Sequence, residues 1–285
     1  MRASVFVPDH ISCIFRPVRY EDVMRSGSKG IGIRLSLGCR ATVSEREDND
    51  LRIAINGQQV DARITASAVR YITDKGFDID LIHQLPLEQG FGTSASGTYA
   101  ATLCVCSLLG LDRSRAIEAT HIMECTMGGG LGDLLAIESE YGIPIRTVPG
   151  APIITGRTEG SDLNMDDITL IVLDEPLKTD SVLNDPVKMG RITEAGDRTM
   201  GEFNGTIGSL FDASNHFSES IGLESPRVRE IMGWIRSNGY HVGMCMLGNS
   251  MFSDAPYELI KDRYPGSDVF RCSSFSGGIE VTRTE

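Results

Sequence analysis

Features that mark several protein classes are scarce or missing from this sequence of 285 residues. No apolar run approaches the roughly 18 residues that a membrane-spanning helix needs. The N-terminus lacks the charged and then apolar pattern of a secretory signal. None of the seven cysteines forms a C-x-x-C pair, which argues against a zinc cluster or a disulfide framework. We therefore expect a cytoplasmic protein without a membrane segment, whose cysteines are mostly reduced core residues.

Positive charge is scarce as well. The formal net charge is −12, so we expect neither nucleic acid nor an anionic membrane as a partner. Of the 27 basic residues 22 are arginine, which makes arginine the expected partner of a substrate carboxylate. The sequence contains no Gly-Lys dipeptide, which excludes a Walker phosphate loop. An anion site remains possible at a helix N-terminus, because backbone N–H groups hold phosphate without adding net charge.

The first part of the chain has the pattern of strands. Apolar and polar residues alternate along Ile33–Val43, Leu51–Ile55 and Phe77–Leu85, and this period of two predicts strands with one buried face. Ser4–Val7 is a shorter strand candidate, and Asn56–Gly57 is a tight-turn signal. We expect these strands to be mainly antiparallel.

Helical patterns follow in the middle of the chain. Ser94–Leu109 is rich in Ala, Leu and Cys, and Gly110 stands where a C-terminal glycine cap belongs. Asp112 is placed to cap a second helix that runs to about Met127. A further helix is expected to begin near Asp133.

The composition changes at Gly150–Asp167, where Pro, Gly, Thr and Asp cluster. This change predicts a boundary between an N-terminal domain, 1–155, and a C-terminal domain, 156–285. Antiparallel strands with helices on one side predict an α+β architecture in both halves. The strands expected after the boundary are Ile168–Leu173, Tyr240–Leu247, Val269–Cys272 and Gly278–Thr282, and the helices are Pro186–Asn204, Gly208–Ser220, Pro226–Asn238 and one near Pro256–Tyr264.

The sharpest local signal is the glycine-rich loop Pro86–Gly97, between an alternating strand and an apolar helix. Its glycines let the backbone approach a ligand, and the first free N–H groups of the helix point at that ligand. Thr93, Ser94 and Ser96 add hydroxyls suited to phosphate oxygens or a magnesium ion. A glycine turn followed by a serine cap is the alternative. The loop also fits the dinucleotide fingerprint, but a second helix stands where a βαβ unit is required, so a dehydrogenase is less favoured.

A second cluster lies on the helices after this loop. His121 and Glu124 share a helix face, and the glycines that follow present Asp133 near the start of the next helix. Phosphoryl transfer needs magnesium, a cradle for the donor and a carboxylate, so Glu124 and Asp133 are candidates for the metal and base roles. The alternatives are a surface glutamate, a structural histidine and a helix cap. Gly27–Gly32 either cradles an anion or starts the next strand flexibly.

Together these segments resemble the GHMP kinases, the superfamily of galactokinase, homoserine kinase, mevalonate kinase and phosphomevalonate kinase. Its central motif, P-x-x-x-G-x-G-S-S-A, is matched from Pro86 to Ala95. The resemblance extends to the archaeal pantoate kinase family along most of the chain. The segments that match that family are Pro8–Ile11, Gly27–Gly32, Gly130–Asp133, Ile145–Pro152 and Met246–Phe252.

This resemblance implies an N-terminal half like ribosomal protein S5 domain 2, with an unusual left-handed βαβ crossover, and a ferredoxin-like C-terminal half. It implies ATP and Mg²⁺ as cofactors, and transfer of phosphate to (R)-pantoate to give (R)-4-phosphopantoate on the way to coenzyme A. Superfamily habit indicates a homodimer. The rival interpretations are a sister kinase for homoserine or a mevalonate-type acid, and a nucleotide-binding protein without catalysis.

The resemblance also assigns roles to residues. Asp133 would act on the attacking hydroxyl, while Ser94 and Glu124 would hold Mg²⁺–ATP. The remaining assignments are the substrate contacts Ser28, His121 and Arg146, and the ATP cradle formed by Gly90, Gly92, Thr93, Ser94, Ala95 and Ser96.

The sequence departs from these families at a few positions. Asp9 stands where the pantoate kinase family usually has Gly, which places an acid beside the presumed substrate wall. Thr93 replaces the first serine of the central motif and keeps its hydrogen-bonding capacity. No lysine stands where mevalonate kinases place their activating one.

Overall fold

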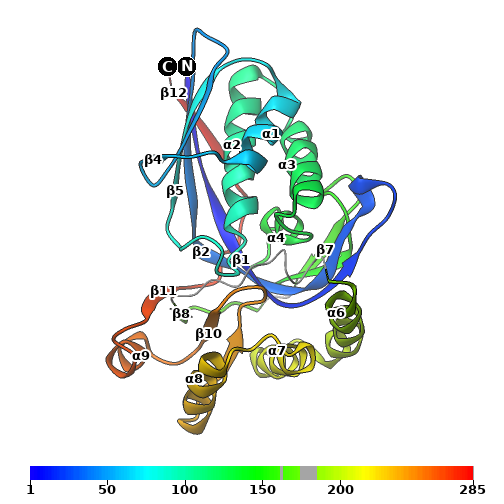
Figure 1. Ribbon diagram of the computed structural model, residues 1–285, viewed down its shortest axis with the longest axis vertical. Coiled ribbons are helices and arrows are strands. Elements are labelled where there is room, and N and C mark those ends of the chain that lie inside the picture. The colour runs from blue at the N-terminus through cyan, green and yellow to red at the C-terminus, as the bar shows by residue number, and fades with distance from the viewer. Residues whose placement is uncertain (161–162, 174–184, 285) are drawn as a thin grey trace.

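The computed structural model describes residues 1–160, 163–173 and 185–284. Its strands form an eight-stranded sheet and a four-stranded sheet, which confirms the α+β prediction (Figure 1). The larger sheet has the order β12-β1-β2-β5-β3-β4, and β6 and β7 extend it from β2. Its strands are β1 (Arg2–Val18), β2 (Gly27–Glu45), β3 (Leu51–Ile55), β4 (Gln58–Gln59), β5 (Phe77–His83), β6 (Pro144–Val148), β7 (Arg157–Gly160) and β12 (Val281–Thr284).

The smaller sheet has the order β11-β8-β10-β9, and all of its pairings are antiparallel. Along the chain, helices separate its first strand from its second, and one helix separates its third from its fourth. This β-α-β-β-α-β succession is that of a ferredoxin-like half, as the resemblance implies. The strands are β8 (Ile168–Val172), β9 (Val242–Met244), β10 (Ser250–Ser253) and β11 (Asp268–Cys272).

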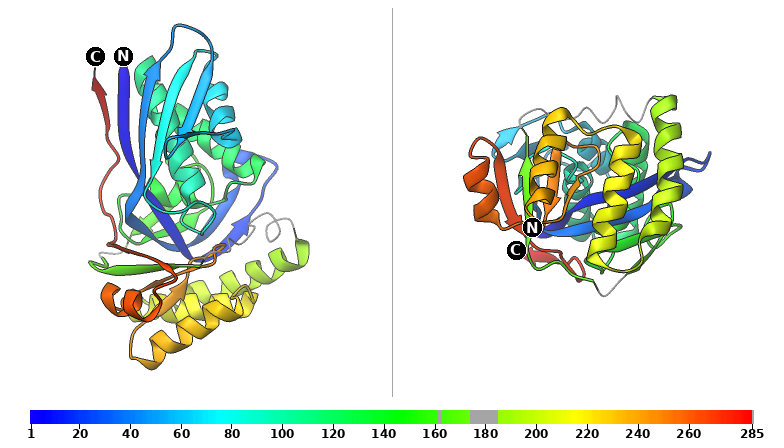
Figure 2. Two further views of the ribbon diagram at one scale, coloured as in Figure 1. Left: turned by 60° about the vertical axis from the view of Figure 1, so that its left-hand side comes forward. Right: turned by 90° about the horizontal axis from the view of Figure 1, so that it is seen from below.

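Helices cover the larger sheet on one face and flank the smaller sheet at the other end of the molecule (Figures 1 and 2). The larger sheet carries α1 (Arg63–Ile72), α2 (Thr93–Leu109), α3 (Arg113–Met127) and α4 (Asp133–Ile137). The other end contains α6 (Pro186–Thr199), α7 (Ile207–Ile221), α8 (Pro226–Ser237) and α9 (Tyr257–Arg263), and the short 3-10 helices are η1 (Val23–Arg25) and η2 (Met200–Glu202). None of the helices in the described ranges has the length and apolar character that a membrane crossing requires.

Strand β1 is much longer than the predicted Ser4–Val7, and it contributes to both apolar cores. Val5 and Val7 belong to the core beneath α2, whereas Ile11 and Ile14 belong to the core shared with the smaller sheet. Register shifts between Pro8 and His10 and between Ser12 and Ile14 interrupt the pairing with β2. The alternation is lost beyond Val7 because these bulges, and burial on both faces, remove the period of two. The middle of β1 therefore lies at the junction of the two cores.

The helix predictions in the middle of the chain are confirmed. Gly110 caps α2 in the left-handed conformation with φ 68°, and the Asp112 side chain accepts a hydrogen bond from Ser114 N at the start of α3. The patterns did not reveal α1, β6, β7 or β10. Strands β3 and β5 pair in parallel with α1 between them, so the expectation of antiparallel strands is wrong for this pair, and the βαβ unit implied by the resemblance is present.

Strand pairing does not follow the predicted domain boundary at every point. Strand β7 lies beyond residue 155 and pairs with β6 in the larger sheet. The last described strand, β12, returns to pair with β1 beside the N-terminus, so the two termini lie together (Figure 1). The division into 1–155 and 156–285 stays a prediction.

Candidate active site

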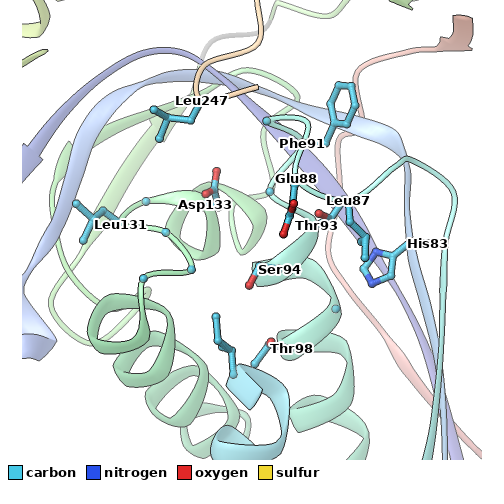
Figure 3. Close-up of a pocket in the computed structure, with 18 of the residues that line it drawn as sticks. His83, Leu87, Glu88, Phe91, Thr93, Ser94, Thr98, Leu131, Asp133 and Leu247 are labelled. Carbon is cyan, nitrogen blue, oxygen red and sulfur yellow. The ribbon is translucent and has the colours of Figure 1, made fainter. Parts of the chain in front are cut away.

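A cavity of about 890 Å³ opens between the start of α2, the glycine turn before α4 and the loop after β9. Figure 3 shows Ser94 and Asp133 at its border, with Leu131 and Leu247 contributed by the two loops. Ser28 also lines the cavity. The segments that the sequence singled out separately therefore meet around one space.

The glycine-rich loop is held by the segment that follows β9. A Cβ on Gly90 would lie 2.9 Å from Met246 O, and one on Gly248 would lie 2.0 Å from Gln89 O. The side chain of Gln89 donates to Leu173 O and accepts from Asn249 N. These contacts explain why the loop needs glycine and why the Met246–Phe252 segment accompanies it in the sequence.

The N-terminus of α2 faces the cavity without a side-chain cap. Gly92 is the N-cap residue in the left-handed conformation with φ 64°. Thr93 and Ser94 line the cavity, as do Gly90 and Gly92. The first N–H groups of this helix are therefore available to an anion.

The positions of Ala95 and Ser96 differ from those of their neighbours. Neither residue lines the large cavity, and both are buried. Ser96 Oγ donates to Asp9 Oδ1 at 2.5 Å, so its hydroxyl is directed to strand β1. The expectation that the Ser96 hydroxyl reaches phosphate is not supported by this geometry.

Ser94 and Glu124 form a direct pair. Ser94 Oγ donates to Glu124 Oε1 at 2.6 Å. Burial and, to a smaller extent, the nearby Asp133 raise the pKa of Glu124 to about 8, against the hydrogen bond from Ser94, which lowers it. A Cβ on Gly129 would lie 2.3 Å from Glu124 Oε2, so the turn after α3 leaves this carboxylate room.

These residues fit a magnesium ion. Mg²⁺ usually binds through one or two carboxylates and substrate phosphates, and it keeps several waters. Glu124 is a buried carboxyl group whose ionised form has no nearby cation to stabilise it, as its raised pKa reflects, and the Ser94 hydroxyl that touches it borders the cavity. Within the described part of the chain, no group of three or more His, Cys, Asp or Glu side chains is arranged to hold a metal ion. The remaining ligands of the ion would be phosphate oxygens and waters.

Asp133 is bonded to a histidine that the sequence did not single out for a role. His10 Nδ1 lies 2.8 Å from Asp133 Oδ1, and His10 Nε2 accepts from Arg146 Nη1 at 3.1 Å. Burial acts to raise the pKa of Asp133, but the hydrogen bond from His10 and the positive charge of Arg146 hold it below its usual value. Asp133 is therefore an ionised carboxylate at neutral pH.

Arg146 lies beneath the cavity. The residue is 1% exposed, and Nη2 also donates to Ser12 Oγ at 3.2 Å. Its Nε has no partner within the structure. A Cβ on Gly132 would lie 3.2 Å from that Nε and 2.0 Å from Ser28 Oγ, so Gly132 separates Nε only narrowly from the Ser28 side of the cavity.

His121 is placed differently from the other predicted substrate contacts. It does not line the large cavity but a small adjoining pocket, together with Glu124 and Asp133. Its Nε2 lies 3.0 Å from Val23 O. Its assignment to the substrate stays a prediction.

Comparisons with known proteins agree with this arrangement. Residues 62–140 match the family model described as GHMP kinases N terminal domain. A curated pantoate kinase of Methanocaldococcus jannaschii is 26% identical over 266 residues, covering 90% of this chain and 94% of that protein. One of Thermococcus kodakarensis is 28% identical over 270 residues, covering 89% and 87%.

Solved structures share the whole fold. A "phosphotransferase related to CoA biosynthesis pathway" superposes with a TM-score of 0.88 at 24% identity, covering 99% of both chains. Homoserine kinase from Cytophaga hutchinsonii superposes with a TM-score of 0.66 at 16% identity, covering 99% of this chain and 97% of that one. Residues 62–140 therefore match the N-terminal domain of the GHMP kinases, and the protein shares its fold with these solved structures.

Proposed function

We propose that this protein is a magnesium-dependent pantoate kinase, which transfers the γ-phosphoryl group of ATP to the primary hydroxyl of (R)-pantoate to form (R)-4-phosphopantoate. The observation that carries the proposal is the meeting of Ser94, paired with Glu124, and the ionised Asp133 beside one cavity. The names of the curated relatives, which align over most of this chain, support the acceptor.

The cavity has separate regions for the parts of the nucleotide. The uncapped N-terminus of α2 suits the phosphates, since its N–H groups and dipole favour negative charge. The region bounded by Ile55, Ile64, Leu81 and Leu87 is apolar and suits a nucleobase. Mg²⁺ held by Ser94, Glu124 and the phosphates would neutralise charge on the transferred group.

The acceptor belongs on the Asp133 side of the cavity. Asp133 would take the proton of the acceptor hydroxyl while the hydroxyl oxygen bonds to the γ-phosphorus and ADP leaves. The turn that contains Gly130 and Gly132 lies against Asp133 on one side and against Ser28 and the buried Arg146 on the other. The hydrogen-bond donors of Ser28 and Arg146 suit a carboxylate such as that of pantoate. The hydroxyl and the carboxylate of one small acid would thereby be held together.

An ADP-release assay with pantoate, homoserine and mevalonate in parallel tests this proposal. We expect turnover with pantoate and Mg²⁺, and little with the other two acids. Turnover with homoserine or mevalonate instead would identify a sister kinase. ATP binding without ADP release for any of the three would contradict catalysis.

A further inference from the structure

We propose that His10 is a positioning residue, which donates a hydrogen bond to Asp133 and leaves the other oxygen of that carboxylate free to accept the substrate proton, while Arg146 fixes the tautomer of His10. This inference rests on the proposed kinase function, because it assigns a support to its catalytic base.

The direction of each hydrogen bond follows from the donors present. An arginine guanidinium has donors only, so His10 Nε2, at 3.1 Å from Arg146 Nη1, must accept. A histidine that accepts at Nε2 is neutral and carries its proton on Nδ1. That proton points at Asp133 Oδ1, at 2.8 Å. The three side chains therefore form a chain in which Arg146 donates to His10 and His10 donates to Asp133.

His10 and Asp133 differ in how far their side chains are buried. The His10 side chain is 0% exposed, whereas that of Asp133 is 25% exposed. In this structure Asp133 therefore borders the cavity, and His10 lies behind it. A Cβ on Gly130 would lie 2.8 Å from Asp133 Oδ2, so the absence of a side chain there keeps this second oxygen open.

Two glycines of strand β2 make room for the side chains of His10 and Arg146. A Cβ on Gly32 would lie 2.1 Å from His10 Nε2, and one on Gly30 would lie 2.6 Å from Arg146 Nη2. From the sequence, the Gly27–Gly32 segment is interpreted as an anion cradle or a flexible start of the strand. Neither interpretation includes making space for His10 and Arg146. The bulge between Pro8 and His10 lies beside it on β1, and bulges re-aim side chains next to active sites.

The groups around these hydrogen-bonded side chains favour an ionised Asp133 and a neutral His10. Asp133 faces His10 and Arg146, and it also acts on the carboxyl groups of Glu124 and Asp9. Burial lowers the pKa of His10 below its usual value, against the hydrogen bond to Asp133. The positive charges of Arg146 and Arg34 lower it further.

The proton balance follows from this arrangement. The O–H bond of the acceptor breaks as its oxygen bonds to the γ-phosphorus, and the bond from that phosphorus to the leaving ADP oxygen breaks. The proton goes to Asp133 Oδ2. His10 keeps its own proton on Nδ1 throughout, so it orients the base without exchanging charge.

Two substitutions of His10 separate its contacts. In His10→Asn the amide nitrogen replaces Nδ1 and keeps a donor to Asp133, whereas in His10→Gln the amide oxygen replaces Nε2 and keeps only an acceptor for Arg146. We expect His10→Gln to lower kcat by about 10- to 100-fold, by analogy with the loss of a residue that orients a metal ligand. We expect His10→Asn to recover most of that loss, with the KM values for ATP and pantoate little changed in both.

The pH profile adds a readout that a purely structural role would not move. Loss of the donor raises the pKa of Asp133, so the acid limb of kcat/KM moves to higher pH in His10→Gln and stays near its original position in His10→Asn. His216→Gln is the matched control, because His216 Nδ1 lies 2.6 Å from Glu202 on the surface, and its kinetics should be normal. Equal losses in both His10 variants, or normal turnover in His10→Gln, would overturn the proposal.

A measurement on the unchanged protein covers the case in which His10 variants fail to fold. In a ¹H–¹⁵N spectrum of histidine-labelled protein, His10 should be protonated at Nδ1 and unprotonated at Nε2 at neutral pH. A proton on Nε2, alone or with one on Nδ1, would overturn the proposal. This readout needs no turnover, so it stays distinct from failure of the proposed function, in which none of the acids is phosphorylated.

Discussion

Ser94 Oγ meets Glu124 Oε1 at 2.6 Å across 30 positions of sequence. Helices α2 and α3 are of similar length and are joined at Gly110–Asp112, so the start of the first lies beside the end of the second. The hydroxyl borders the cavity, and the carboxylate lies behind it. This pair joins the phosphate end of the cavity to the proposed metal site.

Replacing Glu124 with Gln should lower kcat by about 10²-fold and raise the Mg²⁺ concentration needed for half-maximal activity, because a metal-binding charge is lost. A magnesium titration of ADP release measures both effects. Glu118→Gln on the same helix is the control. An unchanged magnesium requirement in Glu124→Gln would remove Glu124 from the metal site.

Ser94→Ala and Ser96→Ala should differ, although the two serines lie in the same helical turn. Ser94→Ala should raise the KM for Mg²⁺–ATP by about tenfold, since a charge-assisted contact contributes about 1.5 kcal/mol or more. Ser96→Ala should leave that KM close to normal and lower the thermal stability, because Ser96 bonds to Asp9 inside the core. Steady-state kinetics and thermal unfolding of both variants measure the difference. The assignment fails if the two variants raise the KM equally.

Asp133→Asn should leave the fold intact and lower kcat by about 10²–10⁴, the range expected when a general base is lost. Asn keeps an oxygen that can accept from His10 Nδ1, so the surrounding contacts survive. Single-turnover kinetics with saturating ATP and pantoate measure the chemical step. Near-normal turnover would show that another group takes the proton.

Arg146→Ala should change two kinetic parameters, whereas Ser28→Ala should change one. Arg146 supports His10 and also has a free Nε toward the Ser28 side, so its loss should raise the pantoate KM and lower kcat. Ser28→Ala should raise the KM, by about 10-fold, with kcat little changed, as expected for a lost binding contact. An unchanged KM for Arg146→Ala would remove it from the carboxylate site.

Asp9 should make the stability of the protein depend on pH. Burial raises the pKa of Asp9 to about 8, and its Oδ2 has no hydrogen-bond partner among the described residues. Between the unfolded value near 3.8 and about 8, the folded state holds a proton that the unfolded state releases, so the folded state loses stability as pH rises. Asp9→Asn removes this loss.

Chemical denaturation of the wild type and Asp9→Asn at several pH values measures this effect. The difference in unfolding free energy should grow in favour of Asn by about 1.4 kcal/mol per pH unit across the middle of that range. The comparison isolates Asp9, because Glu124, whose pKa is also raised to about 8, is present in both proteins. A difference that stays constant with pH would contradict a protonated Asp9.

Elements with their own local signals were predictable. Alternation marked β2, β3 and β5, while Gly110 marked the end of one helix and Asp112 the start of the next. Most of β1 was not predictable, since it is buried on both faces and interrupted by bulges. The parallel pairing of β3 with β5 has no local signal either, because alternation does not indicate which neighbour a strand takes.

The sequence by itself determined the ingredients of the site: the glycine-rich loop, the hydroxyl of Ser94, and the carboxylates Glu124 and Asp133 at ends of helices. Their chemistry and spacing are properties of short segments. Only the tertiary structure decided which hydroxyl faces the cavity and which faces Asp9, and that His10 and Arg146 lie behind Asp133. Those relations depend on contacts between strands and helices far apart in the chain, which packing alone brings together.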